Sequence, residues 1–310
     1  MFSKIGPHVL SNTAPALAWA SQAPVVKQFE RADALRAAPA NALKVCRPIW
    51  HLRTDSGVEA ARDIIRLYDS WGYRPPITEF WNEGDEIGQH LGSGLERRVE
   101  LTAEAVGVFH ANNLQVAGFS FSVANGSEAD WHYIRDHGFA GADYIALHEY
   151  WGNHGFTLDC ALRHRRVHEW LGGVHPPIII TECGRDWIPE EGTFVGGWIA
   201  QGISAEQYLQ ELIAYDYALL QDSYVRGGTP FTAGAAGDPQ WKYFDVDTLV
   251  PAILGAGPIE EPVRLSGWLV FGMLAFAAGS VAVLLNKLQP YEILELQAEE
   301  TIPPGYVEVG

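Results

Sequence analysis

Strand-like and helix-like segments alternate eight times along the first 254 residues, and this alternation constrains the fold more than any other feature of the sequence. The expected strands are 4–10, 24–29, 42–49, 77–81, 115–122, 143–148, 178–181 and 229–232. The expected helices are 13–22, 31–42, 56–72, 95–112, 127–138, 158–171, 204–223 and 244–254. Such alternation indicates an α/β protein with a parallel sheet, and eight units predict closure into a (β/α)8 TIM barrel. An open, doubly wound sheet is the alternative, but no Gly-rich phosphate loop follows the first strand.

The chain divides into a predicted barrel, residues 1–257, and a C-terminal extension, residues 258–310. The extension contains 22 consecutive residues without a charge, 265–286, between Arg264 and Lys287. A bilayer needs about 20 apolar residues, so this hydrophobic helix either spans a membrane or packs as a buried helix on the barrel or in an oligomer contact. A short acidic tail follows it. No secretory signal is visible at the N-terminus, so we expect a chain that is cytoplasmic or anchored in a membrane by 265–286.

The net charge of −17 argues against nucleic acid and anionic membrane surfaces as partners. A hydrophobic content of 47% is ample for a core. Three cysteines without metal-ligand spacing are expected to be free thiols: Cys46, Cys160 and Cys183. Three histidines lie close together in sequence, but their spacing matches no metal motif: His154, His164 and His168. We therefore expect no metal and no cofactor.

Two apolar runs each end in a glutamate, and this pair carries the chemistry. Glu83 follows the strand 77–81, directly after Asn82, and Glu182 follows the strand 178–181. The carboxyl ends of barrel strands form one face, so the two side chains are expected to meet there. Two carboxyl groups suffice to hydrolyse a glycosidic bond: one protonates the departing oxygen, and the other attacks the anomeric carbon or activates a water. Glu83 fits the acid, with Asn82 placed to bind the sugar's 2-hydroxyl, and Glu182 fits the nucleophile.

Three motifs over roughly residues 4–257 resemble the clan A glycoside hydrolase superfamily. They are Trp81-Asn82-Glu83, His148-Glu149-Tyr150 and Ile180-Thr181-Glu182-Cys183-Gly184. The resemblance implies a retaining (β/α)8-barrel enzyme, with Glu83 as acid/base and Glu182 as nucleophile. It also implies that Tyr150 hydrogen-bonds the nucleophile and that His148 lines the −1 subsite.

The sequence departs from that superfamily at two points. Gly84 stands where a proline is common, and the eighth strand has no tryptophan, so Trp241 is the nearest candidate to lie beneath the sugar. Arg47, after the third strand, is the candidate for the arginine near the nucleophile. His8 and Asn125 lie at the same end of the barrel and are further candidate substrate contacts. Because neighbouring strand residues alternate in direction, we expect Glu79 and Glu149 to pair outside the ring.

These observations predict a retaining β-glycosidase that needs no cofactor. Several tryptophans in the upper loops are suited to stacking on sugars and suggest an oligo- or polysaccharide substrate: Trp50, Trp151, Trp187 and Trp198. A catalytically idle barrel that binds carbohydrate, or that is anchored at a membrane, is the alternative. Transglycosylation is a third, because it shares the covalent intermediate with hydrolysis.

Overall fold

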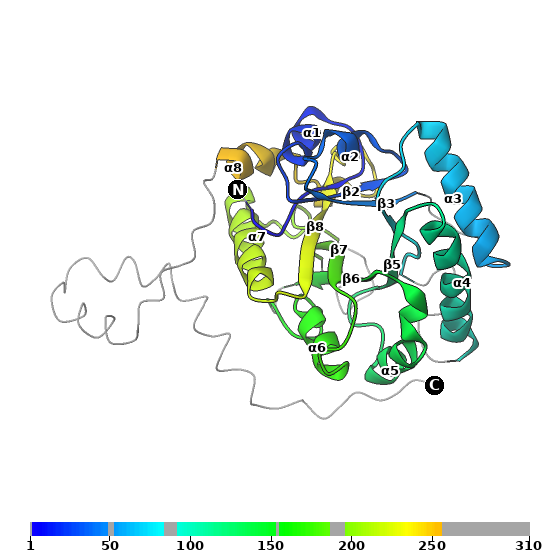
Figure 1. Cartoon of the computed structure of the whole chain (residues 1–310). Coiled ribbons are helices and arrows are strands. Elements are labelled where there is room, and N and C mark those ends of the chain that lie inside the picture. The colour runs from blue at the N-terminus through cyan, green and yellow to red at the C-terminus, as the bar shows by residue number, and fades with distance from the viewer. Residues whose placement is uncertain (1, 49–52, 84–91, 153–154, 187–195, 256–310) are drawn as a thin grey trace, which may run out of the picture. The chain divides into compact units, whose positions relative to one another are not determined.

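Eight parallel strands close into a barrel in a computed structural model that describes residues 2–48, 53–83, 92–152, 155–186 and 196–255. The strands follow one another around the barrel in chain order, and β8 pairs with β1 (Figure 1). Their bounds are β1 His8–Val9, β2 Val25–Phe29, β3 Leu43–Arg47, β4 Ile77–Glu79, β5 Gln115–Phe121, β6 Tyr144–Trp151, β7 Ile178–Arg185 and β8 Val225–Ala233. The predicted (β/α)8 barrel is confirmed, and the open-sheet alternative is wrong.

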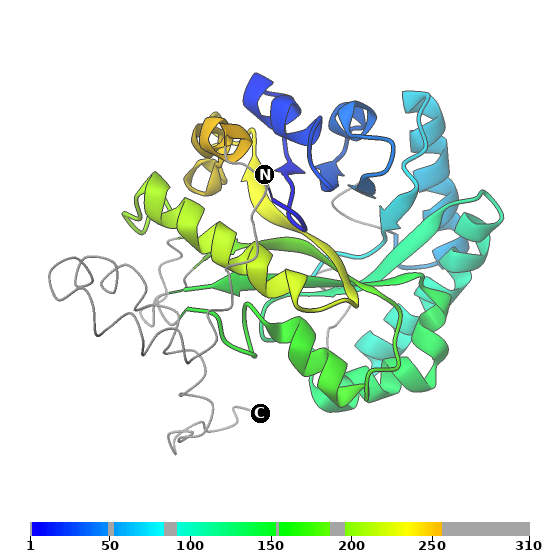
Figure 2. The same ribbon diagram turned by 60° about the vertical axis from the view of Figure 1, so that its left-hand side comes forward.

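Helices surround the strands, as the two ribbon views show (Figures 1 and 2). The described α-helices are α1 Ala14–Ala20, α2 Asp33–Ala37, α3 Gly57–Trp71, α4 Ser93–His110, α5 Glu128–Asp136, α6 Arg163–Trp170, α7 Ala205–Leu220 and α8 Val250–Gly255. Short 3₁₀ turns are η1 Gly138–Gly141, η2 Lys242–Phe244 and η3 Asp247–Leu249. Local sequence signals set several of the ends. The Ser56 side chain caps α3, and Gly72 ends it at a φ of 62°, which suits glycine.

Parts of the prediction fall outside the described residues. The hydrophobic segment 265–286 and the acidic tail do so, as do Trp50, Trp187 and His154. The boundary at residue 257 stays a prediction. Among the residues that the structure describes, no helix is long and apolar enough to cross a membrane.

A small apolar cluster fills the barrel interior beneath the candidate site. Its members are Val45, Ile77, Ala117, Ala146 and Ile179, one from each of strands β3 to β7. Side chains two positions apart on a strand point to the same face, so the residue two places after each of these also faces the barrel interior. By this rule Arg47 faces inward because Val45 does, and His148 faces inward because Ala146 does. Polar side chains therefore form the next layer toward the carboxyl ends of the strands.

One extra residue in β7 decides which way Glu182 faces. Leu147 of β6 pairs with Ile180, but the next residue, His148, pairs with Glu182, so Thr181 forms a bulge. Strict alternation from the inward-facing Ile179 would turn Thr181 inward and Glu182 outward toward the helices. The bulge reverses that phase and places the carboxylate inside the barrel.

Candidate active site

Glu182 accepts hydrogen bonds from three side chains in the barrel interior. Its Oε1 accepts from Lys27 Nζ at 3.0 Å and from Arg47 Nη1 at 2.9 Å, and its Oε2 accepts from the Tyr150 hydroxyl at 3.0 Å. Burial opposes its negative charge, but His148, Lys27 and Arg47 outweigh burial and hold the pKa of Glu182 well below its ordinary value. Glu182 is therefore a carboxylate at neutral pH.

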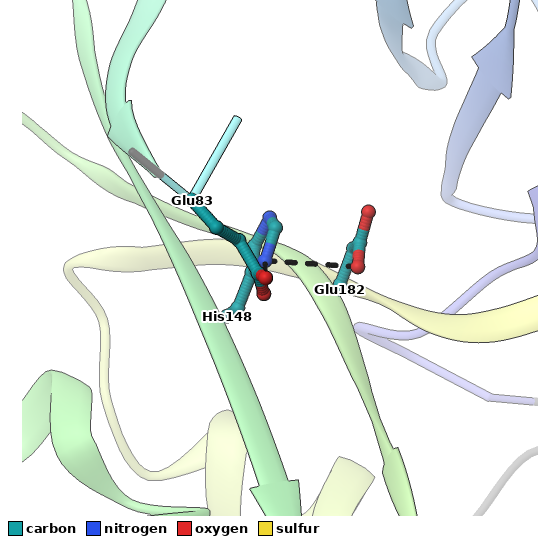
Figure 3. A group of neighbouring side chains, drawn as sticks. All are labelled: Glu83, His148 and Glu182. Atoms are coloured by element: carbon teal, nitrogen blue, oxygen red, sulfur yellow. Dashed lines mark hydrogen bonds and ion pairs between the residues drawn. The ribbon is translucent and has the colours of Figure 1, made fainter. Parts of the chain in front are cut away.

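Glu83 approaches from beyond the end of β4, and Glu83 and Glu182 both lie near the same nitrogen of His148 (Figure 3). His148 Nδ1 lies 2.7 Å from Glu83 Oε1 and 3.6 Å from Glu182 Oε2. One oxygen of each carboxylate and one nitrogen of His148 lie within 4.8 Å of one another. The Glu83 side chain is 31% exposed, against 8% for Glu182. The two carboxylates thus share a site but differ in access to solvent.

Arg47 connects the nucleophile candidate to the residue before the acid candidate. Its Nη1, besides contacting Glu182, donates to Asn82 Oδ1. Burial opposes the charge of Arg47, but Glu182, Glu79 and Glu83 prevail and raise the pKa of its guanidinium. Arg47 therefore contacts Glu182, the candidate nucleophile, directly.

Two residues of the site are missing from the candidates that the sequence supplied. Lys27 on β2 and Glu79 on β4 are completely buried, and Lys27 Nζ lies 2.6 Å from Glu79 Oε2. The Ser120 hydroxyl donates to Glu79 Oε1 at 2.9 Å. The expectation that Glu79 pairs outside the ring is wrong, because Glu79 shares the inward phase of Ile77. The available signal was Lys27 itself, a cation inside the otherwise apolar segment Val25–Phe29.

Glu149 does lie outside the ring, as expected. Its carboxylate accepts from the Tyr215 hydroxyl of α7 at 2.5 Å and lies 2.9 Å from Nδ1 of His164 on α6. His164 Nε2 lies 2.9 Å from Asp222 Oδ2. This second buried group of charges ties α6 and α7 to β6, on the opposite face of the strand from His148.

His8 on β1 lies beside Glu182 with its ring nitrogens available for hydrogen bonds. It is fully buried, its Nδ1 lies 3.9 Å from Glu182 Oε1, and in the described part of the chain neither ring nitrogen has a hydrogen-bond partner. Burial and the charge of Lys27 hold the pKa of His8 well below its ordinary value, so the ring is neutral. A neutral imidazole can both donate to and accept from a sugar hydroxyl.

Two other candidates, Trp241 and Asn125, each contact a neighbouring residue. The Trp241 ring packs edge-on against Phe231 at 5.1 Å between centroids, and Phe231 in turn lies 5.1 Å from the His8 ring. Asn125 lies in the loop after β5, where its amide donates to the Ser122 hydroxyl at 2.6 Å. Substrate contacts by Trp241 and Asn125 stay predictions.

The spacing of Glu83, His148 and Glu182 would also suit a metal ion. The charges around these three side chains bear on whether a cation would bind there. Oε1 of Glu182 already faces two cations, Lys27 and Arg47. A third positive charge would be repelled by both of them. The electrostatics of this cluster favour proton transfer over cation binding.

No family model matches the sequence, and no curated protein matches it. Among solved structures, the chain resembles a GH128 (subgroup I) endo-β-1,3-glucanase from Amycolatopsis mediterranei in complex with laminarihexaose. The TM-score is 0.51 at 15% identity, covering 82% of this chain and 99% of that chain. A structure of the same glucanase without a named ligand gives a TM-score of 0.51 at 17% identity, covering 81% and 99%.

The chain has the fold of this glucanase. At such low identity the likeness establishes the barrel and its order of elements. The fold implied by the resemblance to clan A glycoside hydrolases is thereby confirmed. The roles of individual residues rest on the site itself.

Proposed function

We propose that this chain is a retaining glycoside hydrolase that cleaves β-glycosidic bonds, with Glu83 as acid/base and Glu182 as nucleophile. The observation that carries the proposal is the pair of carboxylate oxygens within 4.8 Å of each other, in contrasting surroundings. Retaining glycosidases hold their carboxyl groups about 5–5.5 Å apart, whereas inverting enzymes leave about 6.5–9.5 Å for a water. The closeness of Glu83 and Glu182 supports the retaining mechanism.

In the first step, Glu182 attacks the anomeric carbon while Glu83 protonates the glycosidic oxygen. The bond from the anomeric carbon to that oxygen breaks, and an ester to Glu182 forms. Oε2 is the suitable attacking atom, because it lies on the side of His148 and accepts a hydrogen bond from the neutral Tyr150 hydroxyl, whereas Oε1 faces the charges of Lys27 and Arg47. In the second step, Glu83 takes a proton from water, the water oxygen attacks the anomeric carbon, and the ester bond breaks.

Asn82 and His8 supply the substrate contacts in this proposal. Arg47 can only donate, so its contact fixes Oδ1 of Asn82 toward the guanidinium. The NH2 group of Asn82 is then the part that can donate to the sugar's 2-hydroxyl. His8, neutral and beside Glu182, is suited to a second hydroxyl of the same ring.

The substrate class in this proposal is an oligo- or polysaccharide. Support comes from the glucanase of the same fold, whose structure contains laminarihexaose. β-1,3-Glucans are therefore the first substrates to test. Transglycosylation would share the ester intermediate, and product analysis with an added acceptor sugar separates it from hydrolysis.

Intact mass after incubation with activated 2-fluoro glycosides tests the nucleophile. We expect a stoichiometric adduct on the wild type and none on Glu182→Gln, with a glucosyl probe in the panel from the start. An adduct on both proteins would remove Glu182 from the role. A folded wild type that stays unmodified across the panel and leaves laminarin uncut would favour the idle, carbohydrate-binding barrel.

A second variant tests the acid. Glu83→Gln should lower hydrolysis of natural glucans by about 10²–10⁴-fold, because general acid catalysis contributes that much. It should spare glycosides whose leaving group departs without a proton. Equal losses on both kinds of substrate would contradict the acid role, and release of the inverted anomer in proton NMR would contradict retention.

A further inference from the structure

A line of buried polar contacts runs beneath the two carboxylates, from Lys27 to Glu83. Lys27 Nζ lies 2.6 Å from Glu79 Oε2, and Glu79 Oε1 lies 3.3 Å from His148 Nε2. On the other side of the ring, His148 Nδ1 lies 2.7 Å from Glu83 Oε1. Lys27, Glu79 and His148 are completely buried. The imidazole therefore carries one carboxylate on each of its nitrogens.

Glu79 determines which nitrogen of His148 holds a fixed proton. Burial opposes the charge of Glu79, but Lys27 and His148 prevail and hold the pKa of Glu79 well below its ordinary value. An ionised carboxylate can only accept, so Nε2 of His148 must donate to it. The remaining proton of the imidazole lies between Nδ1 and Glu83 Oε1. It resides either on His148, facing a Glu83 carboxylate, or on Glu83, facing a neutral ring.

We propose that Glu79 is a positioning residue of the reaction, which fixes His148 with its proton on Nε2 so that Nδ1 stores the proton that Glu83 delivers to the leaving group. This inference rests on the proposed function of Glu83. It assigns a role to Glu79, which acts through His148, and to its partner Lys27, which also contacts Oε1 of Glu182. Lys27 keeps Glu79 ionised, and Glu79 keeps His148 oriented.

The protons balance over one turnover. In the first step the Nδ1 proton of His148 passes to Glu83 Oε1, and the Glu83 proton passes to the glycosidic oxygen. That oxygen leaves as a hydroxyl, His148 becomes neutral and Glu83 is a carboxylate. In the second step water gives a proton to Glu83, which returns one to Nδ1, and the water oxygen takes the anomeric carbon from Glu182. The net reaction consumes one water.

The charge of Glu182 determines when His148 releases its proton and when it regains it. Burial disfavours the imidazolium, but Glu182, Glu79 and Glu83 together raise the pKa of His148 to about 9. Glu182 becomes a neutral ester in the first step. Its negative charge then no longer raises the pKa of His148, so the imidazolium loses its proton more easily as Glu83 protonates the leaving group. When the ester is cleaved, the charge returns and favours protonation of His148 again.

The charged and titratable groups around His148 in the described part of the chain enter this balance. They are Glu79, Glu83, Glu182, Lys27, Arg47, Tyr150 and His8. With the shared proton on His148, three cations on Lys27, Arg47 and His148 oppose the carboxylates of Glu79, Glu83 and Glu182. His8 is neutral, and burial with the charge of Glu182 raises the pKa of Tyr150, which keeps it protonated. Loss of one negative charge at Glu182 is matched by loss of one positive charge at His148.

The pH dependence of kcat/KM in Glu79→Gln tests the proposal. We expect the basic limb of the kcat/KM profile to move to a pH lower by at least about one unit. The reason is that an opposite charge beside a titrating group shifts the pKa of that group by at least this amount. The matched control is Glu149→Gln. It removes the carboxylate from the buried pair of Glu149 and His164, which lies outside the barrel. This variant should leave the basic limb of the pH profile in place. An unmoved limb in Glu79→Gln, or an equal shift in both variants, would overturn the inference.

Nitrogen NMR of wild-type protein labelled at histidine gives an independent measurement, with His148 assigned by its absence in His148→Gln. We expect both nitrogens to be protonated at neutral pH, and Nδ1 to lose its proton first as pH rises. The 2-fluoroglycosyl form should lose it at lower pH. Loss from Nε2 first would refute the role of Glu79, whereas failure of the proposed function would show separately, as absence of any adduct.

Discussion

Replacing Lys27 by methionine tests the electrostatic balance of the barrel interior without reference to activity. Lys27 Nζ lies 2.6 Å from Glu79 and 3.0 Å from Glu182, and the lysine side chain is inaccessible to solvent. With an effective dielectric constant of about 20, each contact is worth roughly 6 kcal/mol before desolvation. Desolvation of the ammonium offsets much of this attraction, so the net loss is far smaller.

Breaking a buried ion pair by removing one partner costs about 3–5 kcal/mol, because the other charge stays buried without compensation. Here two carboxylates lose a cation at once. In a domain of this size each kcal/mol lowers Tm by about 2–4 °C, so Lys27→Met should melt about 6–20 °C below the wild type. Glu79→Gln added to Lys27→Met removes one of the uncompensated charges and should recover more than half of the loss.

Urea and thermal unfolding at neutral pH measure both effects. Lys44→Met is the matched control, since Lys44 lies on the neighbouring strand, is only partly buried and donates to the Ala38 carbonyl rather than to a carboxylate. Its stability should stay within about 1 kcal/mol of the wild type. If Lys27→Met is as stable as Lys44→Met, or if the losses from Lys27→Met and Glu79→Gln simply add, the reasoning about this pair is refuted.

Two further predictions concern single contacts. Tyr150→Phe removes the hydroxyl that donates to Glu182. A hydrogen bond to a charged group is worth about 1.5–3 kcal/mol, so kcat/KM should fall by about 10- to 100-fold. An unchanged kcat/KM would exclude this contact from the reaction. Glu149 and Asp222 outweigh burial and raise the pKa of His164 from 6.5 to about 9, so its contribution to stability is whole below pH 6.5 and is lost as pH rises through 9. Tm of His164→Gln should therefore fall less steeply than that of the wild type between pH 7 and 10, and parallel curves would contradict this assignment.

The barrel was predictable because its signals are local. Apolar strands, helix caps such as Ser56 and Ser204, and a terminating Gly72 each act over a few residues, and their alternation then dictates the architecture. The strand ends were less accurate. β6 and β7 continue to Trp151 and Arg185, beyond the predicted 148 and 181, because the two strands go on pairing with each other as far as these residues.

The contacts at the site were predictable only in part. Arg47, Tyr150 and His148 could be placed near the carboxylates because each ends or follows a strand at the same barrel face. Lys27 and Glu79 could not, because a buried charge on a strand is favourable only when a partner from a distant strand reaches it. That partner depends on the register of the closed barrel, which no local signal in the segment Val25–Phe29 contains.

The bulge at Thr181 has a consequence for transplanting this chemistry into other scaffolds. A regular strand with the same amino acids around Glu182 would present the carboxylate to the helices, where it would meet apolar packing and lose its function. A designer who copies the motif must therefore copy the irregularity with it, or delete one residue before the glutamate. The same rule predicts that deleting Thr181 leaves Glu182 facing the barrel interior, because the glutamate then takes the inward position two places after Ile179.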